Sequence, residues 1–125
     1  MTSKAVLMKA FFTQFTSFAT ELTEMYPNDP DFSMFLNAIQ IAKTANPAMV
    51  IRTVSANVAG FEDKIMAMDE SFFMSHSFEK DYGEYVSDIN VFGKLKQYIQ
   101  DMSPASKANV WKYIQNIMRL AQACA

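Results

Sequence analysis

The chain has 125 residues, half of them hydrophobic, and a formal net charge of −2, which suits a single domain with a substantial core. Its one cysteine and one histidine exclude an internal disulfide, a cysteine-rich zinc site and any catalytic arrangement that needs two histidines. No run of about 20 apolar residues is present to span a bilayer, so we expect a soluble, intracellular protein with no membrane partner.

The first predicted helix occupies about residues 3–26. Thr2 or Ser3 can cap its start, and it should end at Tyr26, because a residue that precedes proline is disfavoured in helical conformation. Its apolar residues recur at intervals of three and four, which places them on one face. That face comprises Leu7, Met8, Phe11, Phe15, Phe18, Leu22 and Met25, widened by Phe12 and Ala19.

A capping residue followed by proline occurs three times, at Asp29-Pro30, Asn46-Pro47 and Ser103-Pro104. The side chain of the first residue can accept a hydrogen bond from the first helical turn, and proline suits the first helical position. The first pair predicts a helix that ends near Ala45. Its buried face should comprise Phe32, Phe35, Leu36, Ile39 and Ala42.

The second pair predicts a third helix after Pro47. Its β-branched residues leave a strand as the alternative, but their spacing of three and four favours a helix. We expect Val50, Ile51, Val54 and Val58 to face inward, and Arg52, Ser55 and Asn57 to face outward.

The middle of the chain is less regular. Gly60 interrupts the helical pattern, and residues 61–68 predict one or two further turns with Ile65 and Met68 inward. Asp69 can cap a short helix, and residues 75–83 are predicted to form a surface loop. A fifth main helix is predicted from Glu84 or Tyr85 to about Asp101. Its apolar face holds Val86, Ile89, Phe92, Leu95 or Ile99, and Met102.

The last helix is predicted over residues 103–125 and carries Trp111, the only tryptophan. We expect the first and last helices to lie at the centre of the fold. The predicted class is all-α: a compact single-domain bundle, residues 1–125, of about five main helices plus a short helix. The buried face of the last helix should comprise Val110, Trp111, Ile114, Ile117, Met118, Ala121 and Cys124, widened by Tyr113 and Leu120.

The sequence offers no set of residues for catalysis. His76 has no second histidine beside it, and Cys124 is best explained as a small apolar residue that completes the last helix. Three isolated glycines cannot build a phosphate-binding loop. We therefore predict a protein that is not an enzyme, with no catalytic residues, no cofactor and no metal.

Charge is divided unevenly along the chain. Residues 62–88 hold eight acidic side chains against two basic ones, and the Phe72-Phe73 pair within them could anchor a partner with a basic surface. The alternative is a solvated acidic face with both rings buried. The candidate partner-binding residues are Asp69, Glu70, Phe72, Phe73, Phe78 and Glu79.

Residues 89–125 carry a net charge of +4. Within them, Lys112 and Arg119 are seven residues apart and share a helix face, which makes them the candidate contacts for nucleic acid. The overall negative charge argues against general nucleic-acid affinity, so this remains the alternative.

Several segments together resemble a family of small, mostly uncharacterised all-helical proteins of large nucleocytoplasmic DNA viruses that infect algae and protists. The resemblance covers nearly the whole chain but implies no catalytic or binding residues. It implies a viral source and a place in the host cell interior, cytoplasm or nucleus, or in the virion. The segments that carry it are residues 11–15, 21–22, 26–32, 42–43, 46–47, 69–73 and 111–114.

These observations favour a non-enzymatic protein–protein interaction module, an adaptor that binds a host or viral protein. A virion structural component, a homo-oligomer and a weakly nucleic-acid-associated protein are the alternatives.

Overall fold

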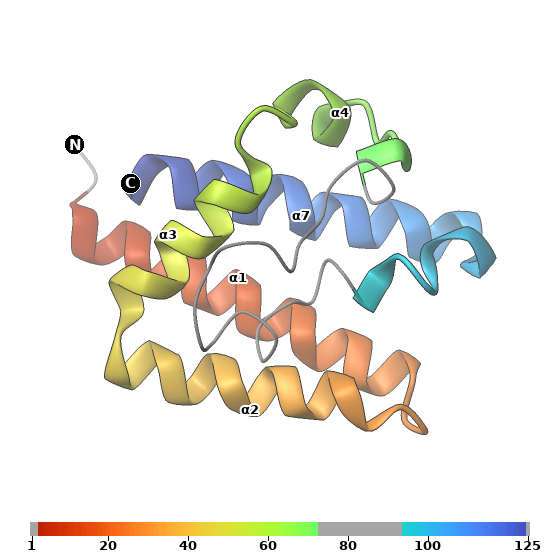
Figure 1. Ribbon diagram of the computed structural model, residues 1–125, viewed down its shortest axis with the longest axis horizontal. Coiled ribbons are helices and arrows are strands. Elements are labelled where there is room, and N and C mark those ends of the chain that lie inside the picture. The colour runs from red at the N-terminus through yellow and green to blue at the C-terminus, as the bar shows by residue number, and fades with distance from the viewer. Residues whose placement is uncertain (1–2, 73–93, 125) are drawn as a thin grey trace.

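The computed structural model describes residues 3–72 and 94–124 (Figure 1). All regular secondary structure in these two ranges is helical, so the predicted all-α class is confirmed. The elements are α1 (Lys4–Met25), α2 (Pro30–Ala45), α3 (Pro47–Val58), α4 (Glu62–Met66), the 3-10 helix η1 (Ile99–Asp101) and α7 (Pro104–Cys124).

The two long helices α1 and α7 lie side by side and run in opposite directions (Figure 1). On its other flank α1 packs against α2, whereas α7 also contacts α3 and α4. Helix α3 leads from the end of α2 across to α4, which sits against α7 (Figure 1). The first and last helices are therefore central, as the sequence predicted.

The helices begin at the predicted capping residues. Asp29 accepts a hydrogen bond from the N–H of Asp31 at 3.0 Å, and Asn46 accepts one from the N–H of Met49 at 3.2 Å. Ser103 does the same for the last helix, with a distance of 3.2 Å to the N of Ser106. Each cap satisfies an N–H that would otherwise lack a partner in the first helical turn.

The buried side chains of all these helices form one cluster. Every apolar residue predicted for the buried face of α7 is buried or half-buried, and the same holds for each predicted position in α1 and α2. The α3 helix is confirmed over the strand alternative, with its four predicted valine and isoleucine positions inside.

One prediction for α3 is wrong. Asn57 was expected to face outward, but it is only 6% exposed, and Thr53 is buried as well. Helix α3 packs against both α2 and α7, so its buried sector is wider than a single neighbour would produce. Thr53 donates its hydroxyl hydrogen to the carbonyl of Met49 at 2.9 Å, whereas the Asn57 Oδ1 has no hydrogen-bond partner in the described chain.

In the connection after α3, only one of the two residues predicted to face inward does so. Ile65 is fully buried, as predicted, but Met68 is 52% exposed. Helix α4 ends at Met66, and Met68 then adopts a left-handed conformation with φ of 56°. This reversal turns its side chain away from the core.

The fifth predicted helix is only partly open to comparison, since its residues 84–93 lie outside the described ranges. Helical structure is present at Lys94 and Leu95 and then gives way to a turn and to η1, so a continuous helix to Asp101 is wrong. Leu95, Ile99 and Met102 are nevertheless all buried, as expected. Among the described helices, none combines the length and the apolar character that a membrane crossing needs.

Candidate functional site

The described part of the acidic segment is used within the fold. Asp69 caps the following turn by accepting a hydrogen bond from the N–H of Ser71 at 2.9 Å. Glu70 pairs with Lys107 of α7, with 3.4 Å between the carboxylate and the Nζ. Asp69 thus stabilises the local turn, and Glu70 links the end of the first described range to α7.

Phe72 lies in the core instead of on the surface. Its side chain is fully buried, and its ring centroid is 5.5 Å from that of Phe61 and 6.4 Å from that of Trp111. The interpretation of Phe72 as an exposed anchor is corrected: the ring completes the packing between the α4 region and α7. The other three candidates, Phe73, Phe78 and Glu79, lie outside the described residues.

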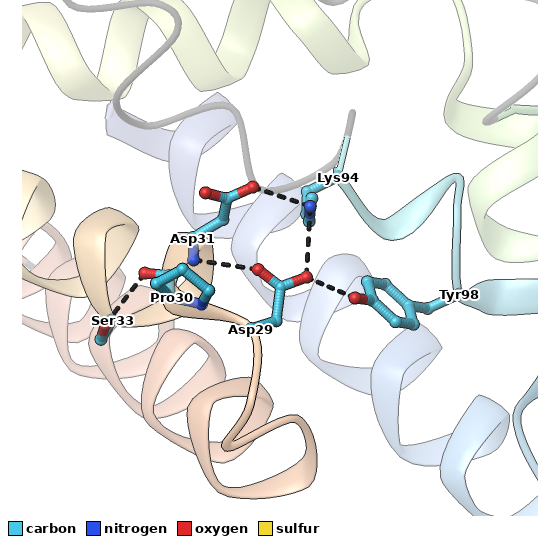
Figure 2. Close-up of polar contacts among 6 residues, drawn as sticks. All are labelled: Asp29, Pro30, Asp31, Ser33, Lys94 and Tyr98. Atoms are coloured by element: carbon cyan, nitrogen blue, oxygen red, sulfur yellow. Dashed lines mark hydrogen bonds and ion pairs between the residues drawn. The ribbon is translucent and has the colours of Figure 1, made fainter.

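A second polar cluster joins the α1–α2 turn to the segment after residue 93 (Figure 2). The Lys94 Nζ lies 3.2 Å from Asp29 and 2.7 Å from Asp31. The Tyr98 hydroxyl donates a hydrogen bond to the same Asp29 carboxylate. The Tyr98 ring also packs against Tyr26, with 4.2 Å between centroids. We refer to Asp29, Asp31, Lys94 and Tyr98 as the Asp29 cluster.

The contacts within the Asp29 cluster shift the pKa values of its members. The hydrogen bond from Tyr98 lowers the pKa of Asp29, helped by the N–H of Asp31 and by Lys94. The hydrogen bond to Asp31 raises the pKa of Lys94, and that to Asp29 raises the pKa of Tyr98. An ionised carboxylate that accepts several hydrogen bonds is a poor proton acceptor, which argues against a catalytic role for Asp29. The contacts of Lys94 and Tyr98 with Asp29 instead attach the 94–102 segment to the α1–α2 turn.

No described cluster of side chains has the composition of a metal site, because no three histidine, cysteine or acidic residues within the described ranges come together. Cys124 is buried, and its burial raises the pKa of its thiol. A thiol of this kind is protonated and unreactive at neutral pH.

A groove runs between α1 and α7. At the end that holds the start of α1 and the end of α7 it widens into a hollow of about 570 Å³. A second hollow shares Gln14 and Asn116 with the first, and a third shares Asn109 and Tyr113 with the second. We call these three adjoining hollows the α1–α7 groove.

The floor and the rim of the α1–α7 groove differ in chemistry. Val6, Ala10 and Leu120 form the apolar floor of the first hollow, and Val6 is 57% exposed. Lys9 and Arg119 stand at the same hollow on opposite helices, and Lys112 lines the next one. The second hollow is lined mainly by polar side chains, namely Gln14, Asn109, Lys112, Tyr113 and Asn116.

The three cations of the groove are not neutralised by the described residues around them. Neither Lys9, Lys112 nor Arg119 forms an ion pair within the described ranges, and α7 contains no acidic residue. The Arg119 Nη2 donates a hydrogen bond to the Met66 sulfur at 3.6 Å. The structure therefore places the two predicted basic candidates on one groove and adds a third cation, Lys9, from α1.

Sequence reasoning missed Lys9 because it belongs to a different helix. Its signal was present in the composition of α1, which has no acidic residue before Glu21. Only the antiparallel packing of α1 and α7 brings this basic half opposite Arg119.

Comparison with known proteins gave no match: no family model, no curated protein and no solved structure is similar to this chain. The function is therefore argued from the geometry of the site.

Proposed function

We propose that the protein is a non-enzymatic binding module that docks an acidic segment of a host or viral protein in the α1–α7 groove. The observation that carries this proposal is the first hollow of the groove, where apolar side chains lie beside Lys9 and Arg119, two cations that form no ion pair with the described residues. Such a surface favours a ligand that buries apolar groups and supplies carboxylates at the edge.

The sequence supports a binding role over catalysis, because one histidine and one cysteine leave few routes to a nucleophile–base pair. The resemblance to small proteins of large DNA viruses supports a place inside an infected cell or in the virion. A virion component should be present at high, fixed copy number in purified particles, and an adaptor should not.

Nucleic acid is the second candidate, favoured by the placement of Lys112 and Arg119 on the same groove. Three cations are a small electrostatic footprint for a phosphate backbone, and the apolar floor contributes nothing to its recognition.

A photo-crosslinking amino acid at position 14 tests the proposal. Gln14 lines two hollows of the groove, and Asn37, exposed on α2, is the matched control position. In extracts of the cells that naturally make the protein, we expect a protein adduct from position 14 and none from position 37. The adduct should disappear when Lys9→Glu and Arg119→Glu are combined.

Three results would count against this function. Nuclease-sensitive adducts would favour nucleic acid. Equal adducts at positions 14 and 37 would show that the groove has no special role. Adducts that survive the double charge reversal would remove the basic rim from recognition.

A further inference from the structure

The α1–α7 groove is polarised along its length. Lys9 and Arg119 line one end and Glu21 lines the other. Twelve positions of α1 separate Lys9 from Glu21, which corresponds to about 18 Å along the helix axis. Glu21 of α1 accepts a hydrogen bond from Asn109 of α7 at 2.5 Å, and this bond joins the two helices at that end of the groove.

The walls of the groove restrict how a peptide can bind. Both are long α-helices whose backbone groups pair within the helix, so they offer no row of free N–H and C=O groups to which an extended strand could add. An amphipathic helix needs no such row, because it binds by placing apolar side chains in a groove between helices.

The spacing of the cations matches a helical ligand. Lys112 and Arg119 are seven residues apart on α7, or about 10.5 Å, two helical turns. Acidic residues seven positions apart on a ligand helix aligned with α7 repeat at the same distance. Lys9, across the groove from Arg119, provides a cation for the flank that faces α1.

Charge also selects the direction of the ligand. Helices favour acidic residues in the first turn and basic residues in the last, because these oppose the macrodipole. A helix with that order complements the groove only when its N-terminal end lies by Lys9 and Arg119 and its C-terminal end lies by Glu21.

We propose that the ligand of the α1–α7 groove is an amphipathic helix of about three to four turns that lies parallel to α1, with acidic residues in its N-terminal half and a basic residue near its C-terminal end. This inference rests on the proposed function and specifies the partner's secondary structure, charge order and orientation.

Selection from a displayed library of helical peptides on the immobilised full chain tests this inference. The library randomises the charge at each exposed position and the side chains of the apolar face. We expect enriched peptides to carry acids seven apart in the N-terminal half. A synthetic enriched peptide should bind about tenfold more tightly than a version with its acidic and basic positions exchanged.

Blocked-groove variants separate this inference from the proposed function. Ala10→Trp fills the hollow, and Thr13→Trp, at an exposed position that also lines it, is a second blocking variant in case the first disturbs folding. Both should abolish binding of the enriched peptide, while Asn37→Trp on α2 should not.

The outcomes are distinct. Enriched peptides that require an open groove but show no charge order, or the opposite order, overturn the helix orientation and leave the proposed function standing. Peptides that ignore both blocking variants, or a library without enrichment, overturn the groove as a protein-docking site and the inference with it.

Discussion

Replacement of Phe72 distinguishes a core residue from a docking anchor. The ring is fully buried and packs against Phe61 and Trp111. Phe72→Ala removes the apolar side chain and leaves a cavity, which costs about 3–5 kcal/mol. A domain of this size has about 5–15 kcal/mol of stability, so the variant should be close to unfolding.

The same substitution should lower the melting temperature by roughly 12–20 °C, at about 4 °C per kcal/mol for a domain of this length. Phe72→Leu keeps most of the apolar volume and loses mainly the aromatic contacts, so it should cost about 1–1.5 kcal/mol. The measurements are thermal unfolding for the melting temperature and urea unfolding for the free energy, both followed by far-ultraviolet circular dichroism. Met34, which is 58% exposed on α2, provides the surface control, and Met34→Ala should change stability by less than about 0.5 kcal/mol.

A loss below about 1 kcal/mol for Phe72→Ala would refute the assignment of this ring to the core. If the assignment is right, Phe72→Asp cannot serve as a binding-site variant, because lost binding would simply reflect unfolding.

Three further predictions concern stability. Tyr98 lowers the pKa of Asp29, so the contribution of ionised Asp29 to the free energy of unfolding is complete above its ordinary pKa of 3.8. That contribution is lost as the pH falls through the lower pKa of the folded state. Asp29→Asn should therefore flatten the fall in urea midpoint between about pH 5 and pH 2, and an unchanged slope would contradict this. Asn57→Leu replaces a buried acceptor that lacks a partner in the described chain and should stabilise the protein by about 1 kcal/mol; a destabilised variant would contradict this. Gly60 has φ of +82°, and a Cβ at this position would meet no atom within 4 Å, so Gly60→Ala should cost about 1 kcal/mol from backbone conformation alone. A neutral result would argue against the left-handed turn.

The helices and their inner faces could be predicted because their causes are local. Asp29-Pro30, Asn46-Pro47 and Ser103-Pro104 each combine a side-chain acceptor with a residue suited to the first helical turn, and each starts a helix where expected. The spacing of apolar residues likewise identified the buried face of α7 before any neighbour was known.

The burial or exposure of three residues could not be predicted from the sequence pattern alone. Asn57 is buried because α3 packs against two other helices. A polar residue in a helical pattern indicates exposure only when the helix packs on one side. Met68 turns outward through a left-handed backbone that few non-glycine residues adopt. Phe72 and its neighbour in the sequence looked equivalent, and only the contact with Phe61 and Trp111 assigns Phe72 to the core.

The candidate site likewise has features that the sequence predicts and features that only the packing decides. The sequence by itself determined that Lys112 and Arg119 share one face of the last helix, because a seven-residue interval is two helical turns. Only the tertiary structure decided that Lys9 joins them, that apolar residues share a hollow with Lys9 and Arg119, and that Asp29 contacts Lys94 and Tyr98. Helical periodicity relates residues within a few turns, whereas the direction in which α1 and α7 pack determines which distant side chains meet, and that direction depends on the whole core.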